Sequence, residues 1–177
     1  MSNPQAFAIS RQGYSLKPLL SDDAAHLQVL FDQCADFFVM TNGTPAAPTA
    51  AVEEFTDIPD SKMPEDIRVF GLTDSHDYLI GTLIGVQQYP DADTWWIGLM
   101  LLTPEYRGQG IGHDFYRAFE QWIAQQGYRF IALCAISPNI AGRQFWQRMG
   151  FEERRKTAPR VYGTKTHEVH VYQRTIG

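Results

Sequence analysis

Apolar and polar residues follow two kinds of pattern along this chain, one typical of strands and one typical of helices. Nearly continuous apolar runs at 67–73, 78–89, 94–102 and 129–136 predict strands, and the run at 94–102 reads as a central strand covered on both faces. The weaker patterns at 14–19, 151–156 and 166–174 predict outer strands. Apolar residues at helical spacing predict helices over 21–40, 51–55, 112–126 and 139–149.

The order of these elements is strand, helices, three strands, helix, strand, helix and two strands. This order predicts an α/β (α+β) fold with one mixed central sheet flanked by helices. The chain has 177 residues, of which 44% are hydrophobic, enough for one domain with a real core. No linker divides it, so we expect a single domain over 1–177.

Charge and composition indicate which kinds of partner this protein is expected to bind. The net charge is −5, with 20 acidic residues against 15 basic ones, which argues against a nucleic-acid partner. No apolar run approaches the ~20 residues that a membrane span needs. The only cysteines are Cys34 and Cys134, and the chain shows no secretory segment, so we expect a cytoplasmic protein without a metal. The sequence is also compatible with a homodimer.

Three glycines stand between the central strand and the helix that follows it. They are Gly108, Gly110 and Gly112, in the stretch TPEYRGQGIGHDFYRAFEQW at 103–122. A glycine-rich turn that opens a helix favours an anion, because backbone N–H groups and the helix N-terminus both point at it. The plain alternative is a tight loop that binds nothing. A Walker loop would need a lysine here, and a dinucleotide fingerprint would need glycine where His113 stands.

The pattern R-x-x-G-x-G from Arg107 to Gly112 resembles the acyl-CoA signature of the GNAT acyltransferases. The helix at 139–149, with the Gly-Phe that follows it, is similar to that family's second motif, so the resemblance covers about 94–151. It implies acetyl-CoA as acyl donor, with the backbone N–H groups of 107–113 on its pyrophosphate. It also implies a splayed central strand with a bulge near its end. The donor-binding residues it implies are Leu102, Thr103, Arg107, Gly108, Gln109, Gly110, Ile111, Gly112, His113, Asn139 and Trp146.

Two positions depart from the family's pattern. Trp96 stands where much of the family has a glutamate that acts as the general base. Trp146 stands where much of the family has a tyrosine that acts as the general acid. Indole can only donate a hydrogen bond, so it replaces neither. Asn139 also has a purely structural alternative as a helix N-cap.

Other residues therefore become candidates for proton transfer and acceptor binding. The alternative for each carboxylate is an ordinary solvated surface group, since exposed acids are the rule, and the alternative for each aromatic residue is plain core packing. The catalytic candidates are Glu53, Glu54, Asp91, Asp93 and Tyr162, with His167 and His170 as further acids or bases; the acceptor-pocket candidates are Asp36, Phe37, Phe38 and Trp96.

The resemblance predicts an N-acetyltransferase that moves an acetyl group from acetyl-CoA to a primary amine by direct attack. The amine belongs to a small molecule or to a protein, and the acidic stretch 53–77 favours a cationic one. Two alternatives stay open at this stage. The first is a non-catalytic acyl-CoA-binding protein or sensor, and the second is a nucleotide-phosphate binder that uses the same loop.

Overall fold

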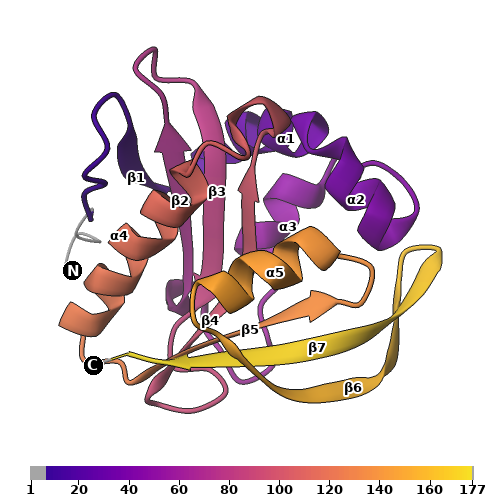
Figure 1. Ribbon diagram of the computed structural model, residues 1–177. Coiled ribbons are helices and arrows are strands. Elements are labelled where there is room, and N and C mark those ends of the chain that lie inside the picture. Colours follow the sequence, from indigo (N-terminus) through magenta and orange to yellow (C-terminus); the bar gives the residue numbers. More distant parts are fainter. Residues whose placement is uncertain (1–6, 177) are drawn as a thin grey trace.

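One seven-stranded sheet organises the molecule, whose computed structural model describes residues 7–176 (Figure 1). The strand order is β1-β2-β3-β4-β5-β7-β6. Only β4 and β5 pair in parallel, and all other neighbours are antiparallel. The mixed sheet confirms the predicted fold class. The strands are β1 (Ser15–Leu19), β2 (Ile67–Thr73), β3 (Leu79–Val86), β4 (Thr94–Leu102), β5 (Phe130–Ile136), β6 (Glu152–Tyr162) and β7 (Lys165–Thr175).

Helices cover both faces of this sheet, each through its own hydrophobic cluster. Leu27, Leu30 and Phe31 pack on one face, and Phe115 and Phe119 pack on the other. Figure 1 shows α4 and α5 in front of the sheet, with the other helices on the opposite side. The helices are α1 (Ala24–Gln33), α2 (Ala35–Asn42), α3 (Ala50–Thr56), α4 (Ile111–Gln125) and α5 (Ile140–Arg148), with short 3-10 turns η1 (Ser21–Asp23), η2 (Pro64–Asp66) and η3 (Pro104–Tyr106).

Two element predictions were wrong in detail. The helix expected over 21–40 is two helices, because the backbone leaves helical geometry at Cys34, with φ −96° and ψ 30°. The strand expected over 151–156 continues to Tyr162, because it forms a long hairpin with β7. The tip of that hairpin reaches α2, where the N–H of Thr164 donates to the carbonyl of Asn42 at 2.9 Å and the ammonium of Lys165 donates to that of Val39 at 2.8 Å.

The sheet opens at its centre. β4 pairs with β5 only along Thr94–Ile97 and Phe130–Leu133, so the later part of β4 has no partner strand on that side. The register between β3 and β4 also shifts at Gly98, which makes Gly98 the extra residue of a β-bulge. The expected splay is therefore present, but the bulge lies in the middle of the strand and not near its end.

The bulge changes which side chains face which helices. Before it, Trp95 and Ile97 belong to the cluster under α4; after it, Leu99 and Leu101 contact the cluster under α1 to α3. A one-residue insertion reverses the alternation of a strand, as observed. The exposed Gly98 thus marks the point where the sheet divides.

Candidate functional site

The glycine loop, defined here as residues 107–113, presents a row of unpaired backbone donors. The N–H of Arg107 donates to the carbonyl of Pro104 at 3.2 Å. The first bond within the following helix runs from the N–H of Asp114 to the carbonyl of Gly110 at 3.1 Å. Between them, the N–H groups of residues 108–113 make no hydrogen bond to any other described residue. Six free donors at a helix N-terminus form a suitable cradle for an anion.

Backbone geometry explains two of the glycines in this loop. Gly108 and Gly110 adopt φ of +73° and +80°, values that L side chains rarely take. At Gly112 an added Cβ atom would lie 3.4 Å from Leu102 and 3.6 Å from the ring of Phe145, which are ordinary contact distances, so space does not require a glycine there. The backbone conformation therefore calls for glycine at Gly108 and Gly110.

Arg11 supports this loop, and sequence reasoning missed it. Its guanidinium donates to the carbonyl of Gln109 at 3.1 Å and to the carboxylate of Asp114 at 2.7 Å. It also lies 3.4 Å from the position that a Cβ atom of Gly110 would take. The partners stand about a hundred positions apart in the chain, so no local pattern indicated the contact. Arg11 adds positive charge to the loop and holds its shape.

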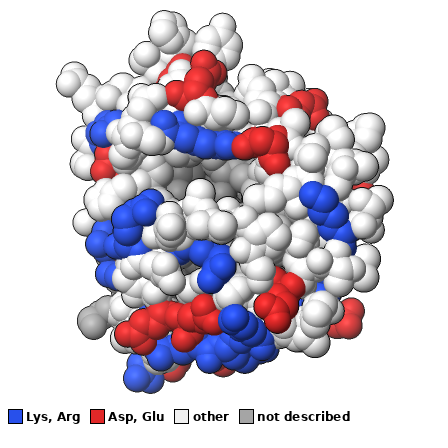
Figure 2. All heavy atoms as spheres, turned by 45° about the vertical axis from the view of Figure 1, so that its right-hand side comes forward, with Lys and Arg blue, Asp and Glu red and all other residues white. Residues whose placement is uncertain are grey.

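A second arginine ties the loop to α2. The guanidinium of Arg107 makes two bonds to Asp36, at 2.5 and 3.2 Å, and its Nε donates to the carbonyl of Leu102 at 2.8 Å. The hydrogen bond from Arg107 holds the pKa of Asp36 below its usual range. Asp36 was expected to line the acceptor pocket, and the structure places it in this ion pair. Figure 2 shows a hollow on one face of the molecule with basic and acidic side chains in contact along its rim.

The expected donor-binding residues around this loop have defined local roles. The carbonyl of Leu102 is engaged by Arg107, and the side chain of Gln109 donates to the carbonyl of Glu105 at 2.6 Å. The imidazole of His113 lies 3.1 Å from Asp114. Thr103 is 2% exposed, and its hydroxyl has no hydrogen-bond partner among the described residues.

The second family-like segment has mainly structural contacts. Asn139 caps α5, since its side chain accepts a bond from the N–H of Gly142 at 3.0 Å. Trp146 is 8% exposed and packs edge-on against Tyr116, with ring centroids 5.5 Å apart, and against Phe151 at 5.2 Å. The structure thus places Trp146 in the core beneath α5.

Among the predicted bases, Glu54 combines partial burial with the lack of a hydrogen-bonding partner among the described residues. It lies on α3, partly buried, and makes no hydrogen bond or ion pair with any described residue. Burial raises its pKa to about 7, and the neighbouring charges of Asp57 and Glu53 act in the same direction. Glu53 is exposed and accepts a bond from Thr49 at 2.6 Å.

Asp91 and Asp93 lie at the other end of the sheet. They form the turn before β4, where Asp91 accepts bonds from the N–H of Asp93 at 3.1 Å and from the hydroxyl of Thr94 at 2.8 Å. This is the closed end, where β4 and β5 still pair. The structure therefore does not bring these two carboxylates to the open part of the strand.

The aromatic candidates divide between core and open surface. Trp95 is buried under α4, and Trp96, on the opposite face of β4, is partly exposed and packs edge-on against Tyr89. Phe38 is 8% exposed, whereas Phe37 is only partly buried against the same cluster. At the hairpin, burial raises the pKa of Tyr162. Its neighbour His167 is bonded to the carbonyl of Thr41 at 2.9 Å.

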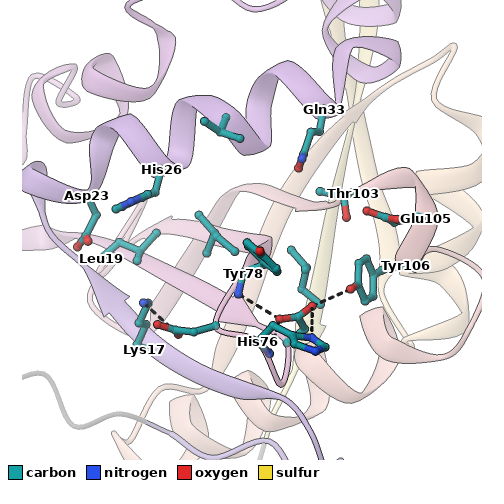
Figure 3. Close-up of a pocket in the computed structure, with 15 residues that line it drawn as sticks. Lys17, Leu19, Asp23, His26, Gln33, His76, Tyr78, Thr103, Glu105 and Tyr106 are labelled. Atoms are coloured by element: carbon teal, nitrogen blue, oxygen red, sulfur yellow. Dashed lines mark hydrogen bonds and ion pairs between the residues drawn. The ribbon is translucent and has the colours of Figure 1, made fainter.

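A separate cavity of about 610 Å³ lies behind η3, between α1 and the turn that joins β2 to β3 (Figure 3). Figure 3 shows Thr103, Glu105 and Tyr106 at one end of it and Asp23 at the other. The hydroxyl of Tyr106 donates to Asp74 at 2.9 Å. This bond anchors the segment that leads into the glycine loop.

Two further features bear on the kind of site that the described residues can form. Between residues 7 and 176, no three or more His, Cys, Asp or Glu side chains are grouped so that they could hold a metal ion. In the same part of the chain, no helix combines the length and apolar character needed to cross a membrane.

Comparison with known proteins identifies relatives of the fold. Residues 30–151 match the family described as Acetyltransferase (GNAT) family. No curated protein matches the chain. An acetyltransferase from Thermus thermophilus superposes with a TM-score of 0.74 at 21% identity, over 93% of this chain and 97% of that one.

Two further solved structures carry more specific names. The ribosomal-protein-S18-alanine N-acetyltransferase of Escherichia coli has a TM-score of 0.69 at 14% identity, covering 93% of this chain and 94% of its own. An acetyl transferase of Salmonella typhimurium, which modifies the N-terminal serine of ribosomal protein L7/L12, has a TM-score of 0.78 at 16% identity, covering 98% and 100%. At these identities the likeness shows the fold.

Proposed function

This chain belongs to the GNAT acetyltransferase family, and on that premise we propose that it transfers an acetyl group from acetyl-CoA to a primary amine by direct attack. The observation that carries the proposal is the row of six free N–H groups at residues 108–113, placed where β4 leaves β5. A diphosphate fits such a row, because each donor is unpaired and the helix N-terminus favours negative charge.

The donor would enter the open part of the sheet. The glycine loop, supported by Arg11, would hold the pyrophosphate of acetyl-CoA, and the unpaired side of β4 would receive its pantetheine arm. The thioester would then lie near the bulge at Gly98, where backbone N–H groups can polarise its carbonyl. Asn139, which caps α5, would lie on the α5 side of the same opening, with Trp146 packed in the core behind it.

Glu54 is the base that the structure supports best. An effective general base has a pKa near the working pH, and a pKa of about 7 meets that condition. The amine nitrogen forms a bond to the thioester carbon, the C–S bond breaks, and the amine's proton passes to Glu54 directly or through water. Asp36 is held by Arg107 and Glu53 by Thr49, whereas the carboxylate of Glu54 has no partner among the described residues.

The sulfur leaves without help from Trp146. An ordinary thiol acidity allows the CoA thiolate to depart as such. Tyr162 is the remaining O–H donor among the candidates, and its raised pKa keeps it protonated at neutral pH.

The acceptor is a primary amine on a small molecule or a protein. Two relatives of this fold are named for acting on ribosomal proteins, one on an alanine and one on an N-terminal serine. Glu54, with Glu53 and Asp57 beside it, favours a cationic acceptor, and Phe37, Phe38 and Trp96 are its proposed walls.

Thermal unfolding with and without ligand tests donor binding. Acetyl-CoA at millimolar concentration should raise Tm, because a ligand that binds only the folded state stabilises it by RT ln(1 + [L]/Kd). The absence of any shift with acetyl-CoA or CoA contradicts the proposal. A larger shift with ATP than with acetyl-CoA favours a nucleotide-phosphate binder.

Release of free CoA thiol over a panel of amines and N-terminal peptides tests transfer. Amine-dependent thiol release, with the acetylated amine detected by mass spectrometry, supports an enzyme. Tight acetyl-CoA binding without turnover over the panel favours a non-catalytic acyl-CoA sensor, the alternative suggested by tryptophan at both positions 96 and 146.

A further inference from the structure

A buried histidine outside the proposed transfer reaction joins a serine to a glutamate. The side chain of His170, on β7, is 3% exposed. Its Nε2 lies 2.9 Å from the hydroxyl of Ser137, and its Nδ1 lies 3.0 Å from the carboxylate of Glu153. The three residues come from the end of β5, from β7 and from β6, so the sheet fixes their relative positions.

The carboxylate decides which nitrogen of His170 carries the proton. The hydrogen bond from His170 holds the pKa of Glu153 below its usual range, so this carboxylate is ionised and can only accept. The Nδ1 of His170 must then donate to Glu153. In the neutral ring Nε2 has no hydrogen, so it accepts the O–H of Ser137. This is the arrangement in which a histidine can take a proton from a serine.

The surroundings of Ser137 suit a nucleophile. Ser137 is partly exposed, directly after β5, beyond the stretch of that strand that pairs with β4. Arg143 of α5 donates to the backbone carbonyl of Ser137 at 3.3 Å and to the hydroxyl of Tyr172 at 3.1 Å. A fixed guanidinium beside the serine can stabilise negative charge that develops on an attacked carbonyl oxygen.

We propose that Ser137 is the nucleophile of a second activity, the hydrolysis of small acyl esters and thioesters, with His170 as general base and Glu153 as the residue that positions it. The distances match those expected between nucleophile, base and orienting group. This activity needs neither the glycine loop nor an amine, so it stands independently of the proposed acetyl transfer.

The chemistry balances with water as the second substrate. Ser137 Oγ forms a bond to the acyl carbon while its proton moves to Nε2 of His170. The bond from carbon to the leaving oxygen or sulfur breaks, and that atom takes the proton from His170. Water then forms a bond to the acyl carbon and gives a proton to His170. The bond from that carbon to Ser137 Oγ breaks, Oγ takes the proton from His170, and the free acid leaves.

A fluorophosphonate probe tests the serine without any acyl donor. An activated hydroxyl displaces fluoride and keeps the phosphonyl group, so the wild-type protein should gain one adduct, mapped by peptide mass spectrometry to Ser137. p-Nitrophenyl acetate should be hydrolysed by the wild-type protein and not by Ser137→Ala. Loss of the base in His170→Gln should slow both reactions by about 100-fold, the usual range of a general base.

Matched variants distinguish a nucleophilic serine from a set of hydrogen bonds that only stabilises the fold. Ser75 and His76 form an exposed pair whose side chains lie 3.5 Å apart. The carboxylate of Asp74 approaches the same Nδ1 of His76 at 3.8 Å, so this imidazole does not connect a serine to a carboxylate through its two nitrogens. Ser75→Ala and His76→Gln should leave labelling and hydrolysis unchanged. Glu153→Asp should recover part of the rate that Glu153→Gln loses.

Three results would overturn the assignment. They are an unlabelled wild-type Ser137, label on several serines alike, or ester hydrolysis that survives in Ser137→Ala. If His170→Gln fails to fold, the position of the adduct in the wild-type protein and the activity of Ser137→Ala still test whether Ser137 is the nucleophile.

Discussion

At the scale of single residues, two tryptophans limit which groups can transfer protons in the proposed reaction. Trp96 and Trp146 occupy the positions where the family's pattern suggests a base and an acid, and indole supplies neither. Proton transfer must then depend on a group whose surroundings, and not its position in a motif, adjust its pKa. Glu54 is such a group, because burial and two like charges act on it together.

We expect Glu54→Gln to lower kcat/KM for the best amine by at least 10-fold. That factor corresponds to about 1.4 kcal/mol of transition-state stabilisation. The wild-type rate should rise with pH through about 7 as the carboxyl ionises, and this limb should disappear in the variant. The matched control is the exposed neighbour in Glu53→Gln, which should keep the rate within a few-fold of wild type and keep this limb, moved to lower pH because one charge that raises the pKa of Glu54 is gone. An unchanged pH profile in Glu54→Gln would show that the base lies elsewhere.

The same substitution carries a stability prediction. The pKa of Glu54 is about 7 in the folded protein against an ordinary value of 4.5, so the folded state holds this proton more tightly than the unfolded chain. Stability is therefore lost as pH rises between about 4.5 and 7. Glu54→Gln should raise Tm relative to wild type at pH 8 and leave it nearly unchanged at pH 4. An equal effect at both values would contradict the raised pKa.

Trp146→Phe should preserve catalysis and weaken the fold. The indole packs against Tyr116 and Phe151 in the core, so a smaller ring leaves a gap that costs about 1–3 kcal/mol. The maximal rate should stay within a few-fold of wild type. A fall of ~100-fold at unchanged CoA affinity would instead assign a chemical role to this position.

At the scale of elements, the glycine loop was predictable and its support was not. Alternating glycines after an apolar run indicate an anion-binding turn because the requirement is local, namely positive φ and open backbone. Arg11 and Asp36 reach this segment from distant parts of the chain, and their contacts exist only after the sheet has formed. The break at Cys34 was missed for the same reason, since apolar periodicity continues across it while the backbone does not.

Gly110→Val and Gly127→Val separate backbone strain from ligand binding. Both glycines have left-handed φ, +80° and +86°, so a β-branched side chain should cost each variant a similar ~1–2 kcal/mol. Gly127 lies just after α4, at the far end from the loop, with nothing within 4 Å of its added Cβ. Only Gly110→Val should abolish the rise in Tm with acetyl-CoA. Equal loss in both variants would mean that strain alone explains the effect.

At the scale of the whole molecule, the acyl site that we propose lies where two neighbouring strands of the sheet part. The sequence predicted the strands, because each apolar run carries its own signal. The place where β4 parts from β5 could not be read from either strand alone, because it depends on a bulge that appears only in the pairing with β3. Gly98 permits that bulge, but glycine within a strand is equally typical of a tight bend or of a close backbone approach.

Hydrogen exchange should show this opening directly. Residues 98–113 and 134–139 form the later part of β4, the glycine loop and the end of β5, and the N–H groups of 108–113 have no described partner. Acetyl-CoA should slow exchange in these two segments, because it pairs or shields donors that otherwise face water. β2 pairs on both edges and lies away from the opening, so 67–73 should exchange equally with and without ligand and serves as the internal control. Protection confined to the cavity behind η3 would move the donor site to that cavity, and uniform slowing of the whole chain would indicate general stabilisation without a defined site.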